Sequence, residues 1–327
     1  MRPIYRSLGR GGLSVSAVGL GCMSLSGVYG TADDAQSVTL IQHAIDNGIN
    51  HLDSSDMYGW GHNEQVIAQA IKGRRDKVVI ASKFGQVRRE GQDNGVDGRP
   101  EHVVAACEAS LKRLGVETID LYYQHRVDPS VPVEETVGAM ARLVTQGKVR
   151  HLGLCEAHPE RIARAHKVHP IAAVQTEYSL FYREEAEATR ALTRDLGIGF
   201  VAYSPLGRGF LTGAIRTQSD IDGRRSAHPR FQPQNFDRNR GLVAALEKVA
   251  ADKRVKPGQL AVAWVLAQGD DVVAIPGTRY SERLDENAAA MSITLTPADL
   301  AAIDAAVPKG AVAGTRYPAG GGKGVFI

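Results

Sequence analysis

Several common signatures are missing from this sequence of 327 residues. There is no C-x-x-C pair, and the cysteines, Cys22, Cys107 and Cys155, lie far apart in the chain. This distribution argues against a disulfide framework and a cysteine-based zinc site, and it favours a reducing, cytoplasmic compartment. No uninterrupted apolar run reaches the ~18 residues that a membrane-spanning helix requires, so we expect no membrane association.

Motifs for phosphate and metal binding are also missing. The sequence contains no strand followed by G-x-G-x-x-G, no G-x-x-x-x-G-K-[ST] and no H-E-x-x-H, which disfavours a Rossmann domain, a P-loop and a zinc protease. His158, His166 and His169 lie in a helix-like stretch with no carboxylate or cysteine set to complete a site, so we expect no metal. The net charge is only +3, with Lys and Arg interleaved with Asp and Glu, so we expect no nucleic-acid partner.

What the chain does contain is a regular alternation of short apolar runs with longer amphipathic segments. This order is typical of βα units around a parallel sheet. In Val103, Cys107 and Leu111, apolar residues recur at helical spacing. The expected strands are Ala17–Gly21, Ile49–Asp53, Val78–Lys83, Ile119–Gln124, Val149–Leu154, Ala172–Thr176, Gly199–Tyr203 and Val272–Ile275. Their number and order predict a single-domain α/β fold, a (β/α)8 TIM barrel, over residues 1–310.

Three features interrupt the regular pattern. Leu8 and Val15 flank a turn-like, glycine-rich stretch, which predicts a β-hairpin before the first strand. A long loop at Arg208–Arg240, between strands seven and eight, is expected to precede a helix at Leu242–Asp252. The glycine-rich residues 311–327 predict a flexible C-terminal tail.

Four titratable residues fall at neighbouring strand ends, where barrel enzymes keep their working side chains. Asp53 ends the second strand, Lys83 ends the third and His125 follows the fourth, while Tyr58 lies in the loop after Asp53. Each alone could be a cap, a packing residue, a solvated charge or a hydrogen-bonded core histidine. Their occurrence together indicates a catalytic group.

The chemistry that these four residues suggest is acid catalysis by a phenol. An ordinary tyrosine keeps its proton up to about pH 10. A lysine cation about 4 Å away contributes roughly 4 kcal/mol at an effective dielectric constant near 20, or about three pKa units. We therefore expect Lys83 to bring the pKa of Tyr58 close to neutrality, with Asp53 holding Lys83 charged and His125 donating a hydrogen bond to a carbonyl oxygen.

The chain resembles the aldo-keto reductase superfamily over essentially its whole length. The resemblance rests on Gly19-Leu20-Gly21, Leu52-Asp53-Ser54-Ser55-Asp56-Met57-Tyr58-Gly59, Ser82-Lys83 and Tyr122-Tyr123-Gln124-His125. It implies that Asp53, Tyr58, Lys83 and His125 are the family's catalytic tetrad. It also implies reduction of a small-molecule aldehyde or ketone with NADPH as hydride donor, giving NADP+.

The resemblance further implies a set of cofactor contacts. Gln175 corresponds to a contact of the nicotinamide carboxamide and Tyr203 to the aromatic residue that stacks on the ring. Many relatives carry Ser-Asn after the fifth strand where this chain has Cys155 and Glu156. Both are taken as cofactor residues: Glu156 could accept a hydrogen bond from the carboxamide, while Cys155 could equally be a small filler at the barrel mouth. The further cofactor residues on this resemblance are Ser204, Leu206, Gly207, Ile275, Gly277, Thr278, Arg279, Arg283, Glu286 and Asn287.

Within that set, Thr278, Arg279 and Arg283 follow a strand end and begin a helix, where hydroxyl, guanidinium and backbone N–H groups can converge on the 2′-phosphate of NADP. Glu286 and Asn287 would meet the adenine. The alternative is that Arg283 and Glu286 form an ordinary exposed helix pair.

Two questions stay open at this level. A cofactor-binding regulatory subunit on the same fold, like the potassium-channel β-subunits, is the alternative to an enzyme, and the chain is compatible with a homo-oligomer. The walls of the substrate pocket are expected from the long loop and from loops that hold Met23, Tyr29, Trp60 and Phe84.

Overall fold

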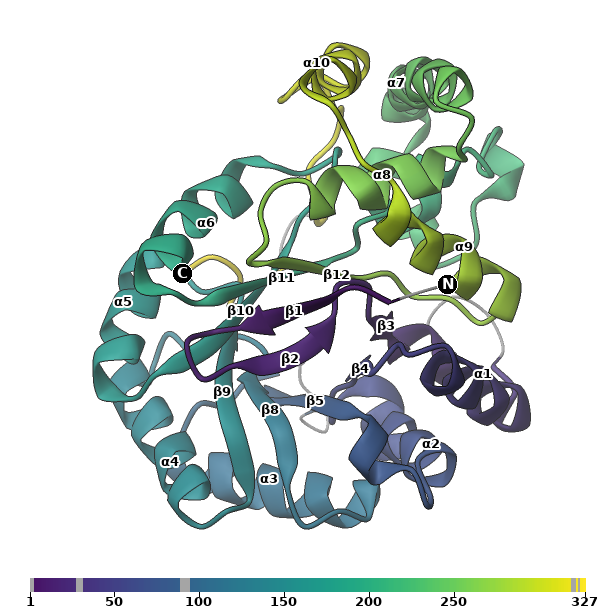
Figure 1. The fold of residues 1–327 in the computed structure, drawn as a ribbon. Helices are drawn as coiled ribbons and strands as arrows, with labels where there is room; N and C mark the ends of the chain where they lie inside the picture. Colours follow the sequence, from purple (N-terminus) through teal and green to yellow (C-terminus); the bar gives the residue numbers. More distant parts are fainter. Residues whose placement is uncertain (1–2, 28–31, 89–94, 319–321, 323) are drawn as a thin grey trace.

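The structure is a computed structural model that describes residues 3–27, 32–88, 95–318, 322 and 324–327. Its centre is a barrel of eight parallel strands surrounded by helices (Figure 1). Neighbouring strands in the sheet follow the order β12-β11-β10-β9-β8-β5-β4-β3. The strands are β3 (Leu20–Gly21), β4 (His51–Asp53), β5 (Val79–Phe84), β8 (Ile119–Gln124), β9 (Val149–Cys155), β10 (Ile171–Glu177), β11 (Gly199–Tyr203) and β12 (Val272–Ile275).

The two ends of this sheet meet just before β3. Val18 forms an isolated parallel bridge with Ala274 of β12. The amide of Gly19 donates to the Ala274 carbonyl at 2.8 Å, and the Ala274 amide donates to the Ala17 carbonyl at 2.9 Å. The first predicted strand is therefore shorter than expected, but its residues still close the barrel. The predicted (β/α)8 fold is confirmed.

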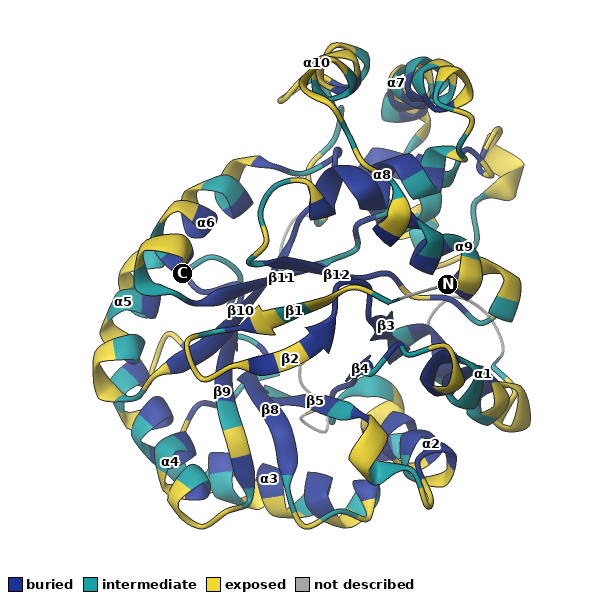
Figure 2. Cartoon of the chain, in the orientation of Figure 1, coloured by how far each residue is buried: buried dark blue, intermediate teal, exposed yellow. Residues whose placement is uncertain are grey.

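Helices cover the outside of the barrel, with buried faces turned inward and exposed faces turned to solvent (Figure 2). Proline occupies the first turn of five of them, α3, α5, α7, α8 and α10, where its missing N–H costs nothing. The helices are α1 (Asp34–Asp46), α2 (His62–Ala70), α3 (Pro100–Leu114), α4 (Val133–Thr145), α5 (Pro159–Val168), α6 (Glu184–Leu196), α7 (Pro233–Asp252), α8 (Pro257–Leu266), α9 (Ser281–Ala289) and α10 (Pro297–Ala306).

The predicted N-terminal hairpin is present as β1 (Tyr5–Leu8) and β2 (Leu13–Ser16), paired antiparallel. Leu8 and Val15 are fully buried and pack with residues inside the barrel, among them Val201 and Val273. A Cβ added at Gly199, the first residue of β11, would lie 2.5 Å from the Leu8 side chain. The hairpin therefore fills the amino-terminal end of the barrel, which leaves the opposite end for a site.

The segment between β11 and β12 differs from the sequence prediction. The helix α7 begins at Pro233, nine residues before the predicted start at Leu242. Gln232 is extended and Pro233 follows as the first helical residue, a start signal that the polar composition of this stretch had hidden. Short 3₁₀ turns occupy the stretch before it: η4 (Gly207–Thr212), η5 (Gln218–Asp220), η6 (Arg225–Ala227) and η7 (Pro229–Phe231).

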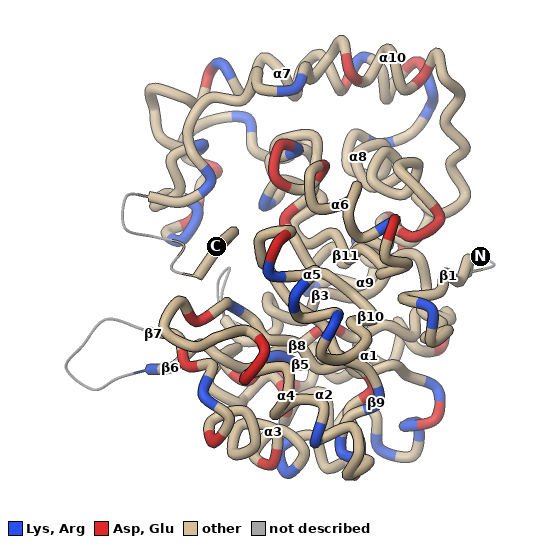
Figure 3. The backbone as a smooth tube through the Cα atoms, turned by 90° about the vertical axis from the view of Figure 1, so that its left-hand side faces the viewer, with Lys and Arg blue, Asp and Glu red and all other residues tan. Residues whose placement is uncertain are grey.

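The remaining elements are small. A second hairpin, β6 (Gln86–Val87) with β7 (Gly95–Val96), follows β5 and was not predicted. Further 3₁₀ turns are η1 (Cys22–Ser26), η2 (Tyr58–Gly61), η3 (Arg75–Lys77) and η8 (Ala290–Ser292). Acidic and basic residues are interspersed along the described part of the chain (Figure 3). Within the described ranges, none of the helices has the length and hydropathy needed to cross a bilayer.

Candidate active site

The four residues of the predicted tetrad meet at the carboxyl ends of three adjacent strands. Asp53 ends β4, Lys83 lies in β5 and His125 follows β8, while Tyr58 begins η2. The ammonium group of Lys83 donates to the Asp53 carboxylate, to the Ser54 carbonyl at 2.7 Å and to the Tyr58 hydroxyl at 3.4 Å. Because β4, β5 and β8 are neighbours in the sheet, the strand order alone brings these groups together.

Lys83 is fully buried, so its charge depends on its partners. Burial is the largest single influence and would lower the pKa of the ammonium group, but Asp53, Tyr58 and Cys155 together outweigh it and hold that pKa above its usual value. Lys83 therefore stays cationic, as the sequence predicted.

The pKa predicted for Tyr58 from sequence is wrong. Burial raises the pKa of the phenol, Lys83 lowers it only in part, and Asp53 opposes Lys83, so that the pKa of Tyr58 is about 12. The sequence argument counted the lysine charge but not the removal of the phenol from water. Tyr58 consequently holds its proton throughout the neutral range, which suits a proton donor better than a base.

His125 stands edge-on to the ring of Tyr58, with ring centroids 5.9 Å apart and planes at 84°. Burial, reinforced by the charges of Arg126 and Lys83, keeps the pKa of His125 well below 6.5. The imidazole is therefore neutral at physiological pH. Its Nδ1 lies 3.0 Å from the hydroxyl of Ser55, a contact that the sequence did not predict.

The residues predicted to hold the nicotinamide carboxamide adjoin this group. The Gln175 amide donates to the second oxygen of Asp53 at 2.7 Å. Cys155 and Glu156 are both buried, and Glu156 has a left-handed backbone with φ of 55°. One oxygen of the Glu156 carboxylate accepts from the Glu177 amide at 2.9 Å and from Arg316. Its other oxygen, Oε2, has no hydrogen-bond partner among the described residues. A buried acceptor without a partner fits a donor such as a carboxamide N–H.

The predicted stacking residue, Tyr203, ends β11 and leads into a tight turn. Ser204 and Gly207 both have positive φ, at 50° and 56°, and Leu206 lies between them. The Tyr203 hydroxyl accepts a hydrogen bond from Arg316 at 2.5 Å and lies 3.1 Å from the Tyr317 hydroxyl. Residues of the C-terminal tail thus reach the edge of the predicted nicotinamide site.

A buried cluster of charges anchors that tail. The carboxylate of Glu177, at the end of β10, accepts from Arg316 at 3.0 Å, from Arg230 at 3.0 Å and from Arg208 at 3.4 Å. Burial alone would raise the pKa of Glu177, but the three arginines, Arg316 foremost, bring it to about 2. Sequence reasoning missed this cluster, because its members lie far apart in the chain.

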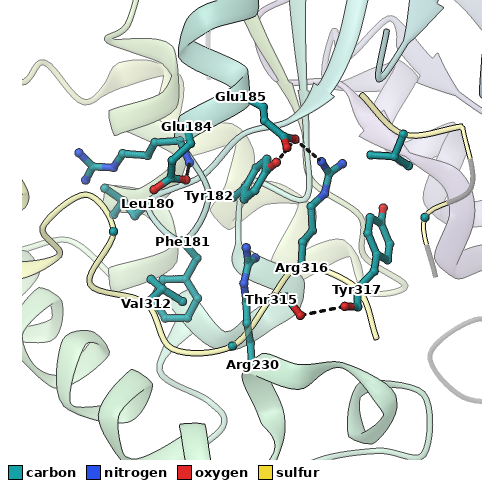
Figure 4. A pocket seen from close by; sticks show the side chains of 15 residues that line it. Leu180, Phe181, Tyr182, Glu184, Glu185, Arg230, Val312, Thr315, Arg316 and Tyr317 are labelled. Atoms are coloured by element: carbon teal, nitrogen blue, oxygen red, sulfur yellow. Dashed lines mark hydrogen bonds and ion pairs between the residues drawn. The ribbon is translucent and has the colours of Figure 1, made fainter. Parts of the chain in front are cut away.

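A cavity of about 450 Å³ lies beside the tail, between it and the start of α6. Figure 4 shows the hydroxyl of Tyr182 and the guanidinium of Arg316 both pointing at the carboxylate of Glu185. Phe181 and Val312 supply apolar wall. None of the four tetrad residues lines this cavity.

The predicted 2′-phosphate region lies at the end of β12 and the start of α9. Ile275 ends the strand, Gly277 and Thr278 follow, and Arg279 precedes the helix. The guanidinium groups of Arg279 and Arg283 lie 5.7 and 5.3 Å from the ring centre of Tyr280. They flank the amino-terminal end of α9, where backbone N–H groups favour an anion.

The two residues expected near the adenine, Glu286 and Asn287, differ in their surroundings. Glu286 pairs with Lys256 of α8 at 2.5 Å, and Asn287 is buried. A small cavity of about 60 Å³ adjoins Arg279 and Tyr280 and is lined on its other side by Asp33, Gln36 and Ser37 of the α1 start. The structure thus brings the α1 start to the predicted phosphate region.

Of the aromatic residues expected in the pocket wall, Trp60 is 44% exposed, directly after the Tyr58 loop, with φ of 53°. Phe84 is a correction: it is fully buried, stacks on Tyr122 with ring centroids 5.1 Å apart, and lines neither of the two cavities described above. Met23 is partly exposed, and Tyr29 lies outside the described residues.

Among the residues that the structure describes, no group of three His, Cys, Asp or Glu side chains could hold a metal ion. The arrangement instead offers a half-buried phenol beside a buried lysine, a neutral imidazole, and a helix start after β12 where backbone N–H groups favour an anion.

Comparison with known proteins gives consistent matches. The sequence model of the aldo/keto reductase family matches residues 17–308. A protein of Glycine max described as probable aldo-keto reductase 1 is 48% identical over 317 residues, which cover 95% of this chain and 90% of the relative.

Solved structures agree. A glycerol dehydrogenase from Gluconobacter oxydans superposes with a TM-score of 0.84 at 31% identity, covering 92% of this chain and 94% of its own. An aldo-keto reductase from Bacillus halodurans, in its holo form, gives a TM-score of 0.79 at 27% identity, with 94% and 97% covered.

Proposed function

This chain belongs to the aldo/keto reductase family, whose members are oxidoreductases acting on carbonyl compounds, and we propose that it reduces aldehydes or ketones with NADPH, using Tyr58 as the proton donor. The observation that carries the proposal is the contact between the buried Lys83 ammonium group and the Tyr58 hydroxyl, at 3.4 Å. When bound, NADPH supplies a hydride to the carbonyl carbon.

The protein's part in this reaction is to place and donate a proton. Tyr58, with a pKa of about 12, keeps its proton until negative charge develops on the carbonyl oxygen. Lys83 then stabilises the phenolate that remains, since its cation is held by Asp53 in a site without water screening. When Nε2 carries the single proton of the neutral ring, His125 donates a second hydrogen bond to the same oxygen, which fixes the carbonyl in place.

The cofactor fits the residues that adjoin this group. Glu156 offers its unpartnered Oε2 to the carboxamide, Gln175 is held beside it by Asp53, and Tyr203 presents a ring for stacking. Ser204, Leu206 and Gly207 would line the path of the pyrophosphate. At the far end, Thr278, Arg279 and Arg283 would bind the 2′-phosphate, with Glu286 and Asn287 near the adenine.

The proposal also includes a cytoplasmic location and a barrel domain followed by a tail. Cys22, Cys107 and Cys155 are all free and buried, which supports a reducing, cytoplasmic setting. Residues 1–310 would form the barrel domain and residues 311–327 a flexible C-terminal tail, of which Arg316 contacts the barrel. A homo-oligomer stays a prediction.

The experiment is to follow NADPH absorbance with purified protein and a panel of aromatic aldehydes, α-dicarbonyls and aliphatic ketones. Glycerol with NADP+ is added because one structural relative is a glycerol dehydrogenase. Consumption of NADPH with at least one carbonyl is expected. Tight NADPH binding with no turnover of any panel member would contradict an enzyme and favour a cofactor-binding regulatory subunit.

A further inference from the structure

Ser55 connects His125 of the tetrad to Asp56, a carboxylic acid that has no role in the proposed chemistry. Its hydroxyl lies 3.0 Å from Nδ1 of His125 and 3.2 Å from Oδ1 of Asp56. Ser55 and His125 are buried, so water does not replace these contacts. The three side chains form one continuous row from Asp56 to the ring that faces Tyr58.

A hydroxyl has a single proton, so Ser55 can donate to only one of its two neighbours. The Met57 amide also donates to the Ser55 oxygen, at 3.3 Å, and the Lys83 carbonyl competes for the Ser55 proton only at 3.5 Å, beyond the normal range. The protonation of Asp56 and of His125 therefore decides whether the Ser55 hydroxyl donates to one or to the other.

If Asp56 is ionised, it accepts the Ser55 proton. Ser55 then accepts from Nδ1–H of His125, and Nε2 of the neutral ring is left as an acceptor. If Asp56 is protonated, it donates to Ser55, Ser55 donates to Nδ1, and Nε2 carries the ring proton. Only the second arrangement lets Nε2 donate to a carbonyl oxygen.

We propose that Asp56, acting through Ser55, sets the tautomer of His125 and thereby decides whether the ring can donate a hydrogen bond to a substrate carbonyl. The inference rests on the proposed function for the identity of that acceptor, but not for the tautomer itself. Asp56 is in this sense a positioning residue, because it does not touch the reacting atoms.

The surroundings of Asp56 make this switch operate near neutral pH. Glu64 of α2, Arg113 of α3 and Tyr122 of β8 face it, and its amide donates to the Lys83 carbonyl of β5 at 3.1 Å. Burial and then the negative Glu64 raise the pKa of Asp56 to about 7, against the opposing Ser55 and Arg113.

The position of the His125 ring proton should depend on pH. Below pH 7 Asp56 is protonated and His125 carries its proton on Nε2. Above pH 7 Asp56 is ionised and the proton moves to Nδ1. The ring itself stays neutral, because the pKa of His125 lies well below 6.5. Reduction should therefore be favoured on the acid side.

The test is NMR of protein with isotope-labelled histidine, followed from about pH 5.5 to about pH 8.5. The His125 signals are assigned by their loss in His125→Gln. The expected result is that the two ring nitrogens exchange their protonated and unprotonated shifts with a midpoint near pH 7, that Asp56→Asn abolishes this change, and that Ser55→Ala does the same. Ser54→Ala is the matched control, since the Ser54 hydroxyl donates to Asn63 instead, and it should leave the change intact.

A tautomer that stays constant in the native protein, or a change that persists in Asp56→Asn or Ser55→Ala, would overturn the proposal. The NMR readout needs no turnover, so a tautomer switch without NADPH oxidation would refute the proposed function and leave this inference standing. The reverse combination would refute only the inference. Where turnover is present, kcat should fall above pH 7 in the native protein and lose that fall in Asp56→Asn.

Discussion

The guanidinium of Arg316 donates to the Tyr203 hydroxyl at 2.5 Å, although the two residues stand 113 positions apart in the chain. The same guanidinium donates to Glu177 at 3.0 Å and to Glu156. One side chain of the C-terminal tail therefore joins the predicted stacking residue to the buried carboxylates at the ends of β9 and β10. The tail takes part in the proposed cofactor site.

This relationship predicts a large stability cost for Arg316→Met, which keeps the length of the side chain and removes its charge. Glu156 and Glu177 would stay buried with fewer partners, a situation that costs about 3–5 kcal/mol. Urea unfolding measures this loss in the free energy of unfolding. Arg164→Met is the matched control, because its pair with Glu134 is exposed and should cost less than about 1 kcal/mol. Equal, small losses in both variants would show that the buried cluster contributes little.

The same cluster predicts a specific acid sensitivity. The pKa of Glu177 is depressed to about 2 in the folded protein from 4.5 in the unfolded chain. Its contribution to stability, roughly 3 kcal/mol, is therefore fully present above pH 4.5 and is lost as the pH falls toward 2. In Glu177→Gln the free energy of unfolding should fall less between pH 5 and pH 3. Parallel curves for the two proteins would contradict this assignment.

Cofactor preference gives a prediction at the other end of the site. Arg279→Ala with Arg283→Ala should weaken NADPH binding by about 10²–10⁴-fold, since the two lost charge-assisted hydrogen bonds contribute about 1.5–3 kcal/mol each, and should affect NADH much less. Fluorescence titration with both cofactors measures the difference. Arg150→Ala is the control, because the Arg150 side chain is exposed and pairs with Asp120 of β8 and not with a residue of this region. Equal losses for NADPH and NADH would place the 2′-phosphate elsewhere.

We predict that Trp60 has a strained backbone conformation and that its side chain contacts the substrate. A φ of 53° disfavours a bulky residue by roughly 1–2 kcal/mol, which Trp60→Gly should relieve and Trp60→Ala should not. Both variants lack the exposed ring, so both should raise KM for aromatic aldehydes more than for aliphatic ones. Thermal unfolding and steady-state kinetics report the two effects separately. Unchanged KM values in both variants would remove Trp60 from the pocket wall.

The fold was predictable because its signal is local and repeated. The apolar run Val78–Ala81 leads into the largely buried strand β5, as its composition indicates, and β8 is buried throughout. Strand adjacency then brings Asp53, Lys83 and His125 together without any further information. The start of α7 was missed because its first turns are polar, although Pro233 was a usable signal.

Features that depend on contacts between distant segments were not predictable. Three partners of Arg316 come from different strand ends and a fourth, Glu185, comes from α6, and no spacing in the sequence connects them. The predicted pKa of Tyr58 was wrong for a related reason. The charge of Lys83, which lowers this pKa, can be read from the sequence, whereas the burial that raises it depends on the folded barrel. Ser55 stands two residues from Asp53, but its contact with His125 needs β4 and β8 in place.

The most direct measurement compares the native protein with Tyr58→Phe in a single turnover of NADPH with a carbonyl that the native protein reduces, alongside the Kd for NADPH. The phenylalanine keeps the ring and removes the proton, so NADPH binding should be nearly unchanged while the rate of carbonyl reduction falls by about 10²–10⁴-fold, the usual contribution of a general acid. A Tyr58→Phe protein that reduces the carbonyl at close to the native rate would contradict the assignment of Tyr58 as the proton donor.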